Sequence, residues 1–179
     1  MSNLGIKEIK VPSSLKLKLN KNILNIESNF GHLAYEIKNN FILELTDKNS
    51  IKFYPKEKGS KNIKCIWGTQ YSLLKNSING LSKGYTKTLD LIGVGFRSSL
   101  DKNKLILKLG FSHEVIYNIP SNVVIKCPKQ DKIIIFGINK QEVNEVVSKI
   151  QLLKKIDPYK GKGILLENTK LRLKEGKKK

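Results

Sequence analysis

The chain has 179 residues, and its 39% hydrophobic content is high enough to build a core and excludes global disorder. Its 34 Lys and Arg against 15 Asp and Glu give a formal net charge of +19, which points to a polyanionic partner, either a nucleic acid or an anionic membrane surface. No apolar run approaches the roughly 20 residues of a membrane span, and residues 1–12 lack the apolar segment of a signal peptide, so we expect a protein that works where it is made.

Two copies of one sequence pattern organise the chain. Residues 21–54 align with residues 102–135 at a constant offset of 81 residues, which indicates an internal duplication. The identical pairs include Lys21 and Lys102, Asn22 and Asn103, Phe30 and Phe111, and His32 and His113.

In the first copy, strands precede one helix. Residues 15–19 alternate polar and apolar side chains, Asn20 and Lys21 form a turn, and residues 23–26 resume the alternation, which predicts a hairpin. Two further strands are predicted at residues 41–45 and 51–54, and a lysine-rich loop follows them at residues 55–65. A helix ending at Gly84 is expected next, because an apolar stripe precedes this glycine. The stripe consists of Tyr71, Leu74, Ile78 and Leu81.

The second copy repeats this order. Its strands are predicted at residues 105–109, 115–118, 123–126 and 132–136. A helix over residues 139–155 is indicated by one apolar stripe, formed by Val143, Val146, Val147, Ile150 and Leu153. Asn139 suits the N-cap position because Glu142, three residues later, completes a capping box.

These patterns predict an α+β fold of two tandem duplicated domains, each a small antiparallel sheet with one helix packed on a face. We place the N-terminal repeat at residues 1–82 and the C-terminal repeat at residues 83–156. Residues 157–179 are expected to form a basic C-terminal tail.

Catalytic and metal-binding patterns are missing from the sequence. His32 and His113 have no partner at the spacing of a catalytic or zinc motif, and Cys65 and Cys127 are isolated, so we expect no enzyme, no cofactor and no metal site. The glycines of GVGFRS, residues 93–98, faintly resemble a dinucleotide-binding turn, but no helix is predicted after them. We interpret them as glycines within a strand, at a bulge or a close backbone approach.

The C-terminal segment begins with DPYKGKG, residues 157–163. Alternating glycine and lysine would let an extended backbone approach a phosphate chain with Lys160 and Lys162 on either side, and the ring of Tyr159 would stack on a base or sugar. Because the segment shows no apolar anchor, we expect it to be unstructured until a nucleic acid binds.

DPYKGKGI and LRLKEGKKK resemble the C-terminal signature of the universal L-six family of large-subunit ribosomal proteins. Residues 68–97, residues 110–115 (GFSHEV) and residues 1–12 are similar to its central segment, its second-domain turn and its opening, so the resemblance covers essentially the whole chain. It implies a duplicated α+β protein that is not an enzyme and binds large-subunit rRNA near the stalk base and the sarcin-ricin loop. Neighbouring ribosomal proteins at the stalk base and nearby translational GTPases are the other partners it implies.

The resemblance also implies a set of rRNA-binding residues, matched position by position. In the tail they are Lys160, Gly161, Lys162, Gly163, Arg172, Lys174, Lys177 and Lys178. Outside the tail they are Lys83, Arg97, Ser112 and His113.

Several residues depart from the family pattern, among them Asn3, Trp67 and Glu114 in place of a basic residue, a histidine and a proline. Leu165 and Leu166 stand where the family usually has Arg-Tyr, so we expect these leucines to pack on the domain itself or on a neighbouring protein. Arg97 and Arg172 are the only arginines, and the richness in Lys, Asn and Ile suggests an adenine- and thymine-rich gene. This favours the mitochondrial matrix as the location, with the plastid stroma or the bacterial cytoplasm as alternatives.

Overall fold

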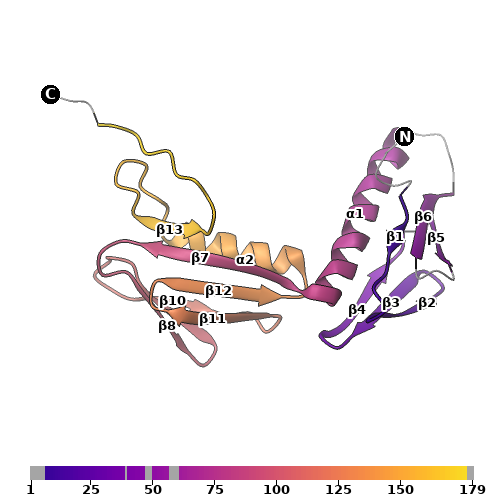
Figure 1. The fold of residues 1–179 in the computed structure, drawn as a ribbon, viewed down its shortest axis with the longest axis horizontal. Helices are drawn as coiled ribbons and strands as arrows, with labels where there is room; N and C mark the ends of the chain where they lie inside the picture. Colours follow the sequence, from indigo (N-terminus) through magenta and orange to yellow (C-terminus); the bar gives the residue numbers. More distant parts are fainter. Residues whose placement is uncertain (1–6, 39, 47–49, 57–60, 177–179) are drawn as a thin grey trace. The chain divides into compact units, whose positions relative to one another are not determined.

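The computed structural model describes residues 7–38, 40–46, 50–56 and 61–176. The chain forms two compact units, residues 1–84 and residues 85–179 (Figure 1). Each unit has antiparallel sheets and one helix, which confirms the predicted α+β class. The strands of each unit divide into two hydrogen-bonded sheets rather than one.

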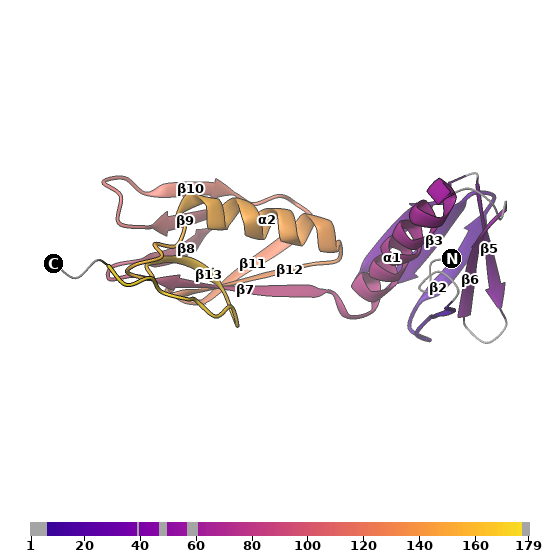
Figure 2. The same ribbon diagram turned by 90° about the horizontal axis from the view of Figure 1, so that it is seen from above.

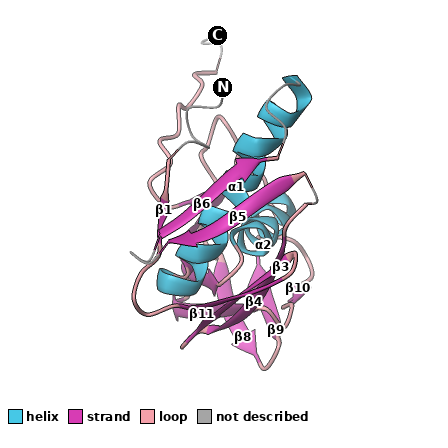
Figure 3. Cartoon of the chain, turned by 90° about the vertical axis from the view of Figure 1, so that its right-hand side faces the viewer, coloured by secondary structure: helices cyan, strands magenta, loops and turns pink. Residues whose placement is uncertain are grey.

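Helix α1 (Lys61–Lys83) contacts both sheets of unit 1. One sheet has the order β1-β6-β5, with β1 at Ile9–Lys10, β6 at Ser50–Pro55 and β5 at Phe41–Thr46. The other has the order β2-β3-β4, with β2 at Lys16–Asn20, β3 at Ile23–Ser28 and β4 at Gly31–Glu36. The helix packs against β3, β4 and β6, and the core of unit 1 therefore lies between the helix and the two sheets (Figure 3).

Helix α1 is longer than the sequence indicated. The four residues of its predicted apolar stripe are buried, and Gly84, with a φ of 71°, follows its last residue as expected. The helix begins at Lys61, so the prediction of a loop over residues 55–65 is wrong from Lys61 onward. Trp67 extends the buried face of the helix by one turn toward its N-terminus. Its side chain is buried, and its Nε1 donates a hydrogen bond to the Phe53 carbonyl at 2.7 Å.

Tyr35 joins β4 to α1 in unit 1. Its hydroxyl donates a hydrogen bond to Gln70 Oε1 at 2.7 Å, and burial raises the pKa of Tyr35 to about 12. The phenol of an unfolded chain has a pKa of about 10. The folded state therefore holds the Tyr35 proton more tightly, and the stability that this contributes is complete below pH ~10 and is lost as the pH rises to ~12.

We therefore expect Tyr35→Phe to flatten the alkaline loss of stability of unit 1. Urea unfolding followed by the fluorescence of Trp67, the only tryptophan, would measure this between pH ~9 and ~12. An alkaline slope in Tyr35→Phe equal to that of the parent would contradict the assignment.

Unit 2 also has two sheets. One has the order β10-β9-β8, with β10 at Val115–Asn118, β9 at Lys104–Lys108 and β8 at Arg97–Asp101. The other has the order β11-β12-β7-β13, with β11 at Val123–Lys129, β12 at Lys132–Gly137, β7 at Tyr85–Ile92 and β13 at Gly163–Leu166. Helix α2 (Lys140–Leu153) packs against β7, β12 and β13.

The predicted start and apolar face of α2 are confirmed. The side chain of Asn139 accepts a hydrogen bond from the Gln141 N–H at 3.0 Å and donates one to Glu142 at 3.0 Å. The residues that α2 buries in the core are Val143, Val146, Val147 and Ile150.

The duplication is visible in the hairpins. Strands β2 and β8 occupy equivalent positions of the repeat, and each is followed by a two-residue turn to the next strand. Lys21 and Lys102 begin these turns with φ angles of 50° and 49°. The hairpin turn predicted at Asn20 and Lys21 is thus present one residue later, at Lys21 and Asn22. The repeat places a second turn at Lys102, and the equivalent lysines adopt the same left-handed conformation in both.

Candidate nucleic-acid interface

Four segments of unit 2 meet at one end of the unit. They are the β7–β8 turn, the β9–β10 turn, the C-terminal end of α2 and the loop that precedes β13 (Figure 2). We call this region the basic end, and define it as residues 93–97, 110–114, 154–155 and 157–163 together with residues 172–174, which pack on the last loop. Most of the residues predicted to bind rRNA lie here, although they come from distant parts of the sequence.

The first segment is the glycine turn between β7 and β8. The Phe96 N–H donates a hydrogen bond to the Gly93 carbonyl at 3.2 Å, and Gly95 has a φ of 78°. The prediction that these glycines lie within a strand is therefore wrong, because they form the turn itself. Strand β8 follows it, so the helix that a dinucleotide site needs is not there. At the tip Val94 is 91% exposed, and Arg97 is exposed at the start of β8.

The second segment is the turn between β9 and β10, which lies against the first. A Cβ added to Gly110 would be 3.3 Å from the Phe96 ring, so the two turns are in contact. In this turn Ser112 and His113 are exposed, and the His113 ring stacks on Phe111 with centroids 6.0 Å apart. An exposed aromatic pair of this kind offers a face on which a base can stack.

Helix α2 brings a cation to the same turn. Lys154 follows the last residue of the helix, and its Nζ lies 4.2 Å from the centroid of the Phe111 ring. Lys154 was not among the predicted site residues. Its position depends on how α2 packs across the sheet, which the sequence pattern does not reveal.

The fourth segment is the loop from Asp157 to Lys162, which folds back on itself. The Asp157 N–H donates to the Lys162 carbonyl at 2.9 Å, and the Gly161 N–H donates to the Asp157 carbonyl at 2.8 Å. Asp157 Oδ1 also accepts a hydrogen bond from the Tyr159 N–H at 2.9 Å. The closed loop leaves the side chains of Lys160 and Lys162 and the Tyr159 ring exposed.

The two glycines of this loop have reasons within the fold. Gly161 is buried with a φ of 70°, and a Cβ there would be 3.2 Å from the Leu173 side chain. Gly163 is buried with a φ of 152°, and a Cβ there would be 2.6 Å from Ile156 Cα. The fold itself therefore requires glycine at both positions, and the exposed side chains of the loop are its lysines and Tyr159. The contact of both glycines with rRNA stays a prediction.

Strand β13 anchors the tail in the sheet of unit 2. Ile164 is 1% exposed and belongs to the core, so the expectation that the tail has no apolar anchor is wrong. Leu165 and Leu166 pair with Asp90 and Leu89 of β7, and Leu166 packs against the same core. Leu166 therefore packs on the domain itself, which is one of the two roles expected for these leucines.

Lys132 ties the end of β13 to β7. Its Nζ lies 3.7 Å from Asp90 Oδ1 and 3.4 Å from Glu167 Oε1. Asp90, and after it Glu167, raise the pKa of Lys132 above its ordinary value. The pair with Asp90 joins β12 to β7, and the pair with Glu167 reaches the residue after β13. Both pairs are partly exposed to solvent, so each contributes little to stability.

The remaining predicted residues divide into three groups. Arg172 and Lys174 are exposed, and the Lys174 N–H donates to the Pro158 carbonyl at 2.9 Å, which holds this stretch against the loop. Lys83 is exposed at the end of α1 in unit 1 and is not part of the basic end. Lys177 and Lys178 lie outside the described residues.

The chemistry of the basic end is that of polyanion binding. Lys154, Lys160, Lys162 and Arg97 supply positive charge, and the stacked pair of Phe111 and His113 and the ring of Tyr159 supply exposed aromatic surface. Among the described residues, no group of three or more His, Cys, Asp or Glu side chains is placed to hold a metal ion. The lysines, Arg97 and the aromatic rings of this surface suit a phosphate backbone with unstacked bases.

Comparison with known proteins gives one family. The chain is 41% identical to the large ribosomal subunit protein uL6m of Reclinomonas americana and 36% identical to uL6 of Bartonella bacilliformis, over the full length of each pair. It is 34% identical to uL6 of Caldicellulosiruptor saccharolyticus, over 99% of this chain and 96% of that protein. The family model described as Ribosomal protein L6 matches residues 92–166. The chain therefore belongs to the ribosomal protein L6 family (uL6), a family of structural, non-enzymatic proteins of the ribosome.

Proposed function

We propose that this protein is a structural constituent of the large ribosomal subunit and that its basic end binds large-subunit rRNA. Membership of the uL6 family supports the first part, since the relatives are named as large-subunit proteins. The observation that carries the second part is the convergence of Arg97, Lys154, Lys160 and Lys162 with the rings of Phe111 and Tyr159 at one end of unit 2. Lysines that bind as point charges would make this contact mainly electrostatic.

The family resemblance supports a finer placement. The rRNA contacted would lie near the stalk base and the sarcin-ricin loop, with neighbouring ribosomal proteins beside it and translational GTPases close by. The protein would then support the platform on which translation factors bind.

We further propose the mitochondrial matrix as the location. The 41% identity to a mitochondrial uL6m supports it, as does the richness in Lys, Asn and Ile. The bacterial relatives at 36% and 34% keep the plastid stroma and the bacterial cytoplasm as alternatives. No helix of the described residues is long and apolar enough to span a bilayer.

Sucrose-gradient sedimentation of a tagged chain from cells tests the proposal. We expect the parent chain to travel with the large subunit, and the Lys160→Gln, Lys162→Gln double variant to leave it at lower salt. Losing two phosphate contacts should weaken the binding about 10- to 100-fold. The matched control is Lys104→Gln, Lys140→Gln, which removes the same charge from exposed positions of unit 2 outside the basic end.

The three chains separate the possible outcomes. Release of the control at the same low salt as the double variant would show that only net charge matters and that the basic end is not the interface. A parent chain that stays at the top of the gradient at low salt would refute the ribosomal role as a whole.

A further inference from the structure

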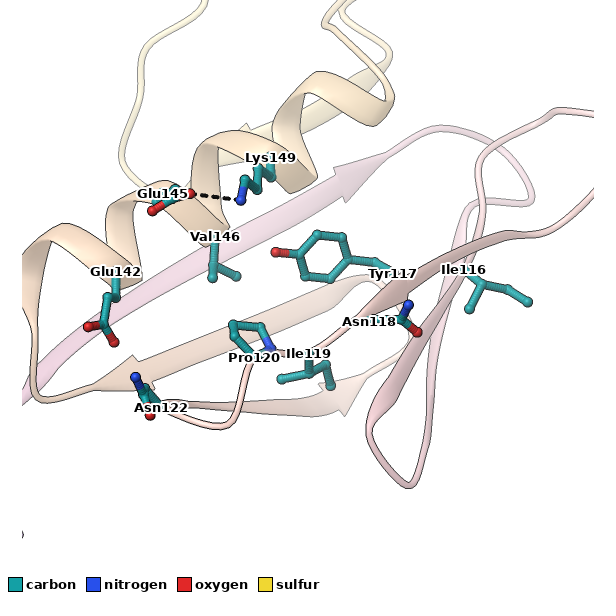
Figure 4. A pocket seen from close by; sticks show the side chains of 10 residues that line it. All are labelled: Ile116, Tyr117, Asn118, Ile119, Pro120, Asn122, Glu142, Glu145, Val146 and Lys149. Carbon is teal, nitrogen blue, oxygen red and sulfur yellow. Dashed lines mark ion pairs between the residues drawn. The ribbon is translucent and has the colours of Figure 1, made fainter.

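Unit 2 carries a groove that the rRNA contact does not use. It lies between β10 and α2 and has a volume of about 590 Å³ (Figure 4). Tyr117, Ile119, Pro120 and Val146 provide its apolar surface, and Glu142 and Glu145 stand on the helical side. The groove is therefore apolar at its base and acidic along one wall.

One side of the groove is the open edge of a sheet. Strand β10 pairs only with β9 among the described strands, in the order β10-β9-β8. The Ile119 N–H donates to the Asn103 carbonyl at 2.9 Å, which shows that the odd-numbered residues direct their backbone groups toward β9. Because strand residues alternate, the N–H and C=O groups of Ile116 and Asn118 face the open edge.

This edge lacks the usual protection. Sheet edges in soluble proteins are blunted by lysines, prolines or covering segments, since an open edge can pair with another chain. The chain has 34 Lys and Arg, yet β10 reads VIYN and contains none of them. Ile116 is 59% exposed on this strand. An exposed apolar residue and unblocked backbone groups make β10 suitable for the addition of a strand.

The charge of the groove selects the occupant. Glu142 and Glu145 face it with one lysine, Lys149, which pairs with Glu145 at 2.7 Å. Two carboxylates against one ammonium make this wall negative in a chain whose net charge is +19. A nucleic-acid backbone would be repelled here, whereas a polypeptide with basic side chains would be attracted.

We propose that this groove binds an extended segment of another protein that carries lysine or arginine at alternate positions. The segment pairs with the backbone of Ile116 and Asn118 as a fourth strand of this sheet, beside β10. Its basic side chains, which share one face of the strand, lay their aliphatic stems on Tyr117 and Val146 and direct their charges to Glu142 and Glu145. This inference depends on the fold of unit 2 and goes beyond rRNA binding, so it stands or falls separately from the ribosomal role.

Amide hydrogen exchange of the isolated full chain tests it, with a synthetic peptide of alternating lysine and valine as the probe. We expect the peptide to slow exchange of the Ile116 and Asn118 amides and to leave that of Tyr117, which already faces β9, nearly unchanged. The Glu142→Gln, Glu145→Gln double variant should bind the peptide about 3- to 10-fold more weakly, since two partly exposed ion pairs are lost. Glutamine at position 142 keeps an acceptor for the Asn139 side chain, so α2 should remain capped.

Two further probes define what would overturn the proposal. A peptide of alternating glutamate and valine should not bind, and equal binding of both peptides would show that the acidic wall selects nothing. A single-stranded RNA that protects the same two amides would assign the groove to nucleic acid instead. The absence of protection at Ile116 and Asn118 at saturating lysine peptide would rule out strand addition at β10.

Discussion

Ile164→Ala should lower the free energy of unfolding of unit 2 by about 2–5 kcal/mol, which is the usual cost of truncating a fully buried aliphatic side chain. Ile164 is 1% exposed and packs in the same core as Leu89 and Leu91 of β7. The substitution leaves a cavity under β13, and the pairing of β13 with β7 depends on that packing. Urea unfolding followed by hydrogen exchange of the β7 amides would measure the loss.

The neighbouring residue provides the control. Leu165 lies in the same strand but is only half-buried, so Leu165→Ala should cost about 1 kcal/mol or less. Equal losses in Leu165→Ala and Ile164→Ala would mean that β13 is not anchored through Ile164, and that the tail is held by its hydrogen bonds alone.

The anchoring of β13 changes how the tail must be tested. Deletion of residues 157–179 removes the basic loop and also removes β13 from the core of unit 2. A failure of that variant to join the ribosome would not separate loss of charge from loss of fold. Replacing Lys170, Arg172 and Lys174 by glutamine keeps β13, the loop and the backbone hydrogen bond from Lys174 to Pro158, so it isolates the charge of these residues.

Local patterns in the sequence were sufficient for much of this fold. The hairpins around Lys21 and Lys102 follow from two-residue alternation and turn residues, and the repeat predicts that both units contain them. The buried faces of α1 and α2 follow from the helical period in the same way. These elements are defined by residues close in sequence, which is why the pattern reveals them.

Strands β7 and β13 were not predicted, because their signals are not local. In β7 only Leu89 and Leu91 are buried, and the first half of the strand is polar. In β13 the sequence GILL is a four-residue island within a lysine-rich segment, and its partner is a strand near the start of unit 2. The burial of Ile164 in the core becomes evident only when β13 is paired with β7.

At the basic end, too, the sequence reveals the residues that belong to motifs and misses those whose position depends on packing. Ser112, His113, Lys160 and Lys162 were identified from motifs, and the structure brings both motifs to one end of unit 2. Lys154 was missed because its contact with the Phe111 ring depends on the packing of α2. The structural requirement for the tail glycines was missed, because a sequence shows where glycine occurs and not which atoms stand where its side chain would be.

The second large effect on stability is expected at Gly163. Gly163→Ala should destabilise the tail of unit 2 by about 3 kcal/mol, because the φ of 152° is unfavourable for alanine and the added Cβ meets backbone atoms. It would lie 2.6 Å from Ile156 Cα and 2.9 Å from the Lys155 carbonyl oxygen. Neither atom belongs to a flexible side chain, so the loop or β13 must move.

The displacement should appear first in two hydrogen bonds that fix the tail. The Ile164 N–H donates to the Lys154 carbonyl at 3.1 Å, and the Glu167 N–H donates to the Thr88 carbonyl at 3.0 Å. We expect Gly163→Ala to speed the exchange of both amides, and Gly176→Ala, where nothing lies within 4 Å of the new Cβ, to leave both unchanged. If both amides stay protected in Gly163→Ala, the glycine is not required by the fold. Its place beside Lys162 would then have to be explained by the nucleic acid that the loop binds.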